Sequence, residues 1–159
     1  MRNYMIGLLC AILLFSGLPM NVLGASEEEA DLSIGIQAPH AILMEVSTGT
    51  ILYEKDAYKK VPMASTTKIM TCIIALENSN LTDTVTISNK ASSIHGSTLG
   101  LSKNAKITME DLLYGLMLRS GNDCAVAIAE HISGSVEAFS ILMNQKAFEL
   151  GLFNSNFIT

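Results

Sequence analysis

A segment that is apolar on nearly every helical face constrains the fold of this chain most. Residues 64–76 favour a helix, and apolar residues crowd the positions after Lys68: Ile69, Met70, Cys72, Ile73, Ile74, Ala75 and Leu76. A helix that is apolar nearly all round is buried in a protein interior. The sequence therefore predicts a central core helix that begins near Ser65 and carries Lys68 one turn later.

The composition is typical of a packed globular protein. The chain has 159 residues, of which 49% are hydrophobic and 16% are charged, and disordered chains have far fewer apolar residues than this. The length suits one domain of ordinary size. The formal net charge is −5 and no basic stripe is visible, so we expect no nucleic-acid partner.

Two segments precede the predicted folded part. Residues 1–25 combine a short basic start, an apolar run over 4–18 and small residues near Gly24, which together predict a secretory signal peptide. An uncleaved membrane anchor is the alternative, although the apolar run is short for a membrane span. Residues 26–37 form an acidic linker. We therefore expect a secreted protein whose folded domain spans residues 38–159.

Strand signals lie mainly in the first half of that domain. Apolar runs at 41–46 and 50–54 flank a Ser-Thr-Gly turn and predict a β-hairpin. Residues 84–88 alternate with period two and predict a short strand, whereas residues 90–106 are rich in Ser, Gly and Asn and predict a loop. Because two or three strands rarely stabilise a sheet alone, we expect the domain to be incomplete at the C-terminus.

Helix signals dominate the second half. Thr108 and Asp111 have the spacing of a capping box in front of a helix with leucines at 112, 113 and 116. Two further helices are predicted over 122–132 and 136–150, and Gly134 and Gly151 mark their ends.

Ser65 and Lys68 have the spacing of a serine nucleophile and its base. Residues three apart on a helix share a face, so the Lys68 amine can reach the Ser65 hydroxyl. A serine hydroxyl becomes nucleophilic when a base takes its proton, and apolar surroundings favour the neutral amine that can do so. The helix N-terminus and the Ser65 N–H would stabilise the oxyanion. A helix-capping serine beside an unrelated lysine is the alternative.

Ser120-Gly121-Asn122 is the second candidate motif. Ser102-Lys103-Asn104 has the same Ser-x-Asn form, but it lies in a polar loop. Ser120 instead lies in the predicted turn between two apolar helices, where its hydroxyl can face a cleft. Its structural alternative is an N-cap for the next helix, a role that is compatible with catalysis.

The remaining reactive side chains give weaker signals. Cys72 and Cys124 lie in apolar helical patterns and are interpreted as small buried residues, with a single bridge between them as the alternative. A triad of Ser120, His131 and Asp123 has no positional support. The histidines are isolated, and a metal site from His95, His131, Cys72 and Cys124 lacks the spacing of metal ligands.

Taken together, the motifs resemble a known family. Ser65-Thr66-Thr67-Lys68-Ile69-Met70-Thr71, Ser120-Gly121-Asn122-Asp123 and Ala129-Glu130-His131-Ile132 look like the low-molecular-mass penicillin-binding D-alanyl-D-alanine carboxypeptidases. These are serine peptidases of family S11 in the β-lactamase-like superfamily, and the resemblance covers residues 38–158. The third motif of such proteins, Lys-Thr-Gly, does not occur in this sequence. In the family it follows the point at which this chain ends.

The resemblance implies roles for four residues. Ser65 would be the acylated nucleophile and Lys68 its proton acceptor. Ser120 would relay the proton to the departing D-alanine, and Asn122 would bind the amide of the stem peptide. The implied reaction removes the terminal D-alanine from peptidoglycan stem peptides in cell wall biogenesis, outside the cytoplasm in the cell envelope.

The resemblance also implies a fold and partners, and it implies no metal and no organic cofactor. The fold would be of the α/β (α+β) class, β-lactamase/transpeptidase-like, with an antiparallel sheet beside a helical cluster. The partners would be stem peptides ending in D-Ala-D-Ala and β-lactam antibiotics, and membrane association is possible in the full-length protein. A β-lactamase and a non-catalytic stem-peptide or penicillin binder are the alternatives. We expect weak or absent penicillin labelling of this chain alone.

Overall fold

The computed structural model describes residues 35–158 of the chain. The predicted signal peptide and most of the predicted acidic linker lie outside the described residues. The described residues fall into two compact units, one that runs to Ala57 and one that begins at Tyr58. The predicted domain boundaries stay predictions.

The first unit is the predicted β-hairpin. Strand β1 (Ala41–Met44) pairs antiparallel with β2 (Ile51–Lys55), and Ala41 lies opposite Lys55. The register shifts between Leu43 and Met44. The prediction of a hairpin on either side of a Ser-Thr-Gly turn is therefore confirmed.

A carboxylate closes the turn of this hairpin. The Glu45 side chain accepts hydrogen bonds from the Thr48 hydroxyl at 2.6 Å, and from the backbone N–H groups of Ser47 and Thr48 at 3.0 and 2.7 Å. All of these bonds favour the ionised form. They lower the pKa of Glu45 to about 2, so the turn keeps its charged acceptor in all but strong acid.

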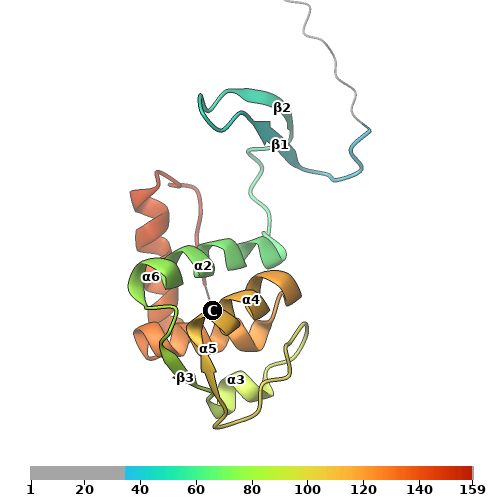
Figure 1. The fold of residues 1–159 in the computed structure, drawn as a ribbon. Helices are drawn as coiled ribbons and strands as arrows, with labels where there is room; N and C mark the ends of the chain where they lie inside the picture. The colour runs from blue at the N-terminus through green and yellow to red at the C-terminus, as the bar shows by residue number, and fades with distance from the viewer. Residues whose placement is uncertain (1–34, 159) are drawn as a thin grey trace, which may run out of the picture. The chain divides into compact units, whose positions relative to one another are not determined.

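The second unit is a helical cluster with a two-stranded antiparallel ribbon (Figure 1). Its elements, in chain order, are η1 (Ala64–Thr66), α2 (Thr67–Asn78), β3 (Thr84–Thr86), α3 (Asn89–Ser93), β4 (Lys106–Thr108), α4 (Met109–Arg119), α5 (Asn122–Ser133) and α6 (Val136–Glu149). The mixture of helices and antiparallel strands confirms the predicted α+β class.

Helix α5 is the element with the widest set of neighbours in this unit. It contacts α2, α3, α4, α6 and β3. One buried cluster joins its first two turns to α4 and to the ribbon, and a second joins its middle to α2 and α6. Alanines at 125, 127 and 129 leave little side chain between α5 and its neighbours. The first turn of α5 is consequently held by packing on several sides.

The prediction that residues 64–76 form a helix buried on nearly all faces is wrong. The first three residues form the 3-10 turn η1, and α2 follows from Thr67. Helix α2 buries Met70 and Ile74 against its neighbours, but Ile69 and Leu76 are 52% and 56% exposed. The reason is that α4, α5 and α6 contact α2 and cover only part of its circumference within this unit.

Two short elements overlap the stretch predicted as one loop over 90–106: α3 occupies its start, and β4 begins at its last residue, Lys106. Helix α3 is fixed locally, because the Ser88 hydroxyl accepts a hydrogen bond from the Ala91 N–H at 2.9 Å. Strand β4 pairs with β3, with Thr84 opposite Thr108. Three residues are too few for an alternating pattern to show in a sequence, which explains why this strand was not predicted.

The predicted helix ends are borne out. The Thr108 hydroxyl accepts the Asp111 N–H at 3.1 Å and caps α4, while the same hydroxyl donates to the Asp111 carboxylate at 2.6 Å. Gly134 and Gly151 follow α5 and α6 with φ of 78° and 75°. Both lie in the left-handed region, where glycine carries no steric penalty.

Within residues 35–158, no single helix is long and apolar enough to cross a membrane. Helices α5 and α6 pass such a test only as a pair, by length and composition, with a bend of 83° between them.

Candidate functional site

Lys68 and Asn122 meet although 54 positions separate them in the chain. The Lys68 Nζ donates a hydrogen bond to the Asn122 Oδ1 at 2.8 Å, and both side chains are half-buried. Lys68 lies in the first turn of α2, and Asn122 is the first residue of α5. The contact between these two helices therefore brings together the two motifs that the sequence analysis selected.

Ser65 lies in η1, one turn before Lys68, and is exposed. The residue before it, Ala64, has φ of 46°, which is a left-handed conformation that costs energy for any residue with a Cβ. Such backbone strain often accompanies functional sites. Among the described residues no hydrogen bond joins Ser65 to Lys68, whose amine is bound to Asn122 instead.

Ser120 follows α4 as its C-cap residue and has a left-handed backbone, with φ of 56°. The N-cap of α5 is Gly121, so the alternative interpretation of Ser120 as that N-cap is wrong. The Ser120 Oγ is buried and has no hydrogen-bond partner among the described residues. A buried hydroxyl without a partner costs roughly 1–3 kcal/mol, which is unusual for a residue with only a structural role.

A loop segment that the sequence analysis did not select completes the surroundings of Asn122. The Asn122 Nδ2 donates to the His95 carbonyl at 2.9 Å, and its backbone N–H donates to the Ser97 carbonyl at 2.7 Å. Between them, Gly96 has φ of 95°, and a Cβ there would lie 2.8 Å from the Asn122 Nδ2. The glycine was the one local signal of this close approach. Ser102, the competing serine, is exposed further along the loop.

The weaker candidates do not assemble into a second site. His131 lies with its Nε2 3.7 Å from an Asp83 carboxylate oxygen, and the Asp123 carboxylate is occupied by backbone N–H groups. The triad of Ser120, His131 and Asp123 is therefore not formed. Across residues 35–158, no group of three His, Cys, Asp or Glu side chains is placed to hold a metal ion.

Both described cysteines are free thiols. Cys72 is half-buried and Cys124 is buried, so the alternative of a bridge between them is not realised. Burial, and then the charge of Asp123, raises the pKa of Cys124 to about 12. A thiol with so high a pKa is a poor nucleophile at neutral pH, and Cys124 behaves as an apolar core residue.

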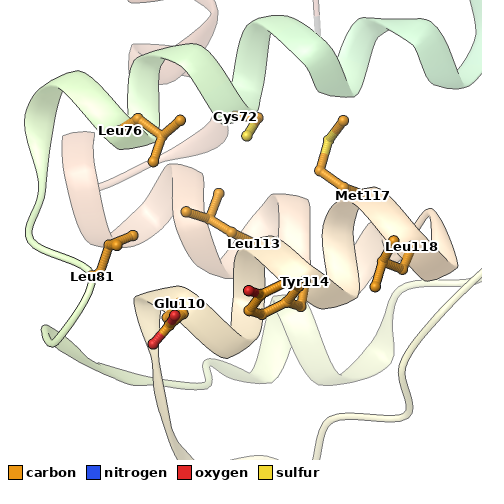
Figure 2. Close-up of a pocket in the computed structure, with 8 residues that line it drawn as sticks. All are labelled: Cys72, Leu76, Leu81, Glu110, Leu113, Tyr114, Met117 and Leu118. Atoms are coloured by element: carbon orange, nitrogen blue, oxygen red, sulfur yellow. The ribbon is translucent and has the colours of Figure 1, made fainter.

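A hollow of about 330 Å³ lies between α2 and α4, away from these residues (Figure 2). Cys72 and Leu76 line it from α2, and Leu113 and Met117 line it from α4. None of Ser65, Lys68, Ser120 and Asn122 lines it. Because its walls are almost wholly apolar, it offers little to a polar reaction, and the candidate site remains at the two helix starts.

Known proteins are similar to this chain in sequence and in fold. The family model described as peptidase S11, D-alanyl-D-alanine carboxypeptidase, matches residues 25–159. The D-alanyl-D-alanine carboxypeptidase DacF of Bacillus subtilis is 36% identical over 162 residues, which cover 99% of this chain and 41% of that protein.

The solved structures that match this chain include proteins of the same kind as the sequence relatives. The D-alanyl-D-alanine carboxypeptidase DacD from Francisella tularensis matches with a TM-score of 0.75 and 37% identity, over 78% of this chain and 31% of that one. Penicillin binding protein 5 from Haemophilus influenzae matches with a TM-score of 0.72 and 35% identity, over 78% of this chain and 38% of that one. The chain thus spans less than half the length of these relatives. It belongs to the peptidase S11 family of D-alanyl-D-alanine carboxypeptidases.

Proposed function

We propose that the protein to which this chain belongs is a serine-type D-Ala-D-Ala carboxypeptidase. It removes the terminal D-alanine from peptidoglycan stem peptides through an acyl-enzyme on Ser65. The observation that carries this proposal is the 2.8 Å hydrogen bond from Lys68 to Asn122. It joins the lysine beside the nucleophile to the second motif, which also contains the buried hydroxyl of Ser120.

The proposed reaction has two steps. In the first, the Ser65 Oγ attacks the carbonyl carbon of the penultimate D-alanine while Lys68 accepts the hydroxyl proton. The C–N bond then breaks, Ser120 relays the proton from Lys68 to the nitrogen of the departing D-alanine, and an ester on Ser65 remains. In the second step, water attacks that ester and frees both the shortened peptide and Ser65.

Three of the four residues have surroundings that suit their proposed roles. Ser65 is exposed, as a group that attacks a cell-wall polymer must be. A neutral Lys68 amine retains two N–H donors and one lone pair, so it can keep its bond to the Asn122 Oδ1 and still accept a proton. The Asn122 amide, anchored to the His95 carbonyl, would recognise the amide of the stem peptide.

The location and partners follow from the proposed substrate. Peptidoglycan lies outside the cytoplasm, and the signal-peptide pattern of residues 1–25 would direct secretion to the cell envelope. β-Lactam antibiotics would acylate Ser65 as analogues of the stem peptide. The membrane association considered for the full-length protein belongs to the same proposal.

A chimera tests the proposal directly. This chain would replace the matching part of the Bacillus subtilis relative, of which it covers 41%. We expect the chimera to carry a fluorescent penicillin on Ser65, located by peptide mass mapping, and to release D-alanine from a peptide ending in D-Ala-D-Ala. Lys68→Ala should slow the labelling by about 10²–10⁴-fold, the range for loss of a general base.

Ser102→Ala is the matched control, because Ser102 has the same Ser-x-Asn pattern as Ser120 but lies in an exposed loop. It should leave labelling unchanged, whereas Ser120→Ala should reduce it. A folded chimera without label on Ser65 would overturn the proposal. Fast turnover of a chromogenic cephalosporin would favour the β-lactamase alternative. D-alanine release by the 159-residue chain alone would contradict the expectation of weak or absent labelling.

A further inference from the structure

The carboxylate of Asp123 is bonded to four backbone N–H groups. Its oxygens accept hydrogen bonds from Leu99 at 3.0 Å, Gly100 at 2.8 Å and Leu101 at 3.1 Å, all from the loop before β4. A fourth comes from the Cys124 N–H at 3.0 Å, in the first turn of α5. Three of the four bonds thus connect one helix residue to three consecutive residues of a distant loop.

Asp123 makes these contacts from a buried position, and within residues 35–158 no salt bridge joins its carboxylate to a cation. The residue is 2% exposed, and an unpaired buried carboxylate is costly unless hydrogen bonds compensate for it. Burial alone would raise the pKa of the Asp123 carboxyl, but the bonds from Leu99, Leu101, Cys124 and Gly100 outweigh it and leave the pKa below its usual value. The carboxylate is therefore charged at neutral pH and fixed in place.

The loop fixed by Asp123 is the same loop that holds Asn122. Upstream of Leu99, the carbonyls of His95 and Ser97 accept hydrogen bonds from the Asn122 side chain and backbone. Gly96 lies so close to the Asn122 amide that a Cβ there would clash at 2.8 Å. Two neighbouring residues of α5, Asn122 and Asp123, thus form hydrogen bonds to opposite ends of the segment 95–101.

We propose that Asp123 is a positioning residue for the candidate site: it fixes the segment 95–101, and through that segment it sets the orientation in which the Asn122 amide binds Lys68. An amide that donates to the His95 carbonyl must point its oxygen the other way, toward the Lys68 Nζ. If the segment moved, the amide would be free to turn its Nδ2 toward the lysine, because the neutral amine that the proposed reaction requires has a lone pair that can accept from it. The role in the reaction rests on the proposed function, but the geometric role does not.

Amide hydrogen exchange and the side-chain amide signal of Asn122 test the geometric role on this chain. In Asp123→Asn, an amide replaces one acceptor oxygen, so we expect exchange at Leu99, Gly100 and Leu101 to accelerate by about tenfold or more beyond the change at Ile128. The Asn122 side-chain amide signal should shift as well. Ile128→Val is the matched control, since it weakens the core of the same helix without touching the segment.

If Asp123→Asn accelerated amide hydrogen exchange equally at all sites, the proposal would be overturned, because the variant would show only a general loss of stability. A loosened segment with an unchanged Asn122 signal would also overturn it, since that result would leave Asp123 a structural role alone. Should Asp123→Asn fail to fold, Asp123→Ser retains a neutral acceptor oxygen. The unmodified chain gives a further check: exchange at Leu99–Leu101 as fast as in a free loop would overturn the proposal without any variant.

The role of Asp123 in the reaction is tested with the same chimera. Asp123→Asn should slow penicillin acylation of Ser65 by at least about tenfold more than Ile128→Val does. This difference in acylation rate should persist at temperatures where both variants are fully folded. Equal rates in the two variants would overturn the role in the reaction. An unmodified chimera that is never acylated would instead refute the proposed function, while the exchange measurements would still decide the geometric role of Asp123.

Discussion

The two serines of the candidate site have different surroundings. Ser120 lies between two core helices with its hydroxyl buried, and Leu116, one turn earlier, is 1% exposed. Ser65 lies in a 3-10 turn that has no buried residue, and Met63 before it is 61% exposed. We call these the Ser120 side and the Ser65 side of the site.

The difference in burial predicts how substitutions on each side affect the stability of the protein. On the Ser120 side, packing of α4 on α5 sets the backbone, so substitutions there should act largely through stability. On the Ser65 side, the backbone depends on one turn and the start of α2, so substitutions there should lower stability little, and one that relieves backbone strain should raise it. The four predictions below would contradict or refine this contrast.

The largest effect is expected from a cavity beneath the Ser120 side. Leu116→Ala removes a fully buried side chain and should lower the free energy of unfolding by about 2–5 kcal/mol. Met63→Ala, next to η1, should change it by no more than about 0.5 kcal/mol. Urea unfolding followed by circular dichroism measures both, and similar losses for the two variants would contradict the contrast.

A smaller loss is expected from adding one methyl group at Gly121. A Cβ there would lie 2.9 Å from the Asp123 carboxylate and 3.3 Å from the Gly115 carbonyl, and such overpacking costs roughly 1–3 kcal/mol. Gly35→Ala is the control, because nothing lies within 4 Å of a Cβ at that position. The same unfolding measurement applies, and a neutral Gly121→Ala would show that the turn between α4 and α5 is less constrained than its contacts imply.

A gain is expected on the Ser65 side. Ala64 has φ of 46°, a conformation that glycine adopts without penalty, so Ala64→Gly should raise the free energy of unfolding by up to about 1 kcal/mol. Ala125→Gly, inside α5, should lower it by roughly 0.5–1 kcal/mol. A loss of equal size in both variants would mean that the strain at Ala64 is absent in solution.

The smallest effect appears only in acid. The four N–H bonds hold the pKa of Asp123 below its ordinary value despite burial. A carboxyl whose pKa is lowered on folding contributes stability above its unfolded pKa of about 3.9, and this contribution is lost as the pH falls through the folded value. Amide signals of the segment 95–101 should therefore broaden below about pH 4, before those of η1. If the amide signals of η1 broadened at a higher pH than those of the segment 95–101, the contrast between the two sides would be contradicted.

Local chemistry made much of this structure predictable from the sequence. The hairpin, the Thr108 cap and the ends of α5 and α6 depend on neighbouring residues, and all of them are confirmed. The family resemblance is confirmed by the match over residues 25–159. The roles of Ser65, Lys68, Ser120 and Asn122 stay predictions, although the contact between Lys68 and Asn122 supports the pairing of the two motifs.

What could not be predicted depends on distant parts of the chain. The partners of Asn122 are the main-chain carbonyls of His95 and Ser97, and since every residue has a carbonyl, no residue type signals them. The exposure of Ile69 on α2 depends on which helices pack around it, not on its own sequence. Strand β4 is too short to show a period, and it is recognised only by its pairing with β3.

The apolar hollow between α2 and α4 has a practical consequence for anyone who handles this chain. Leu76, Tyr114 and Met117 expose large apolar surfaces around it in the folded state. Dyes that fluoresce on apolar surfaces should therefore bind the native chain and give a high signal before any heating. A thermal-shift assay that relies on such a dye would understate the cooperativity of unfolding, and calorimetry or circular dichroism is the sounder choice.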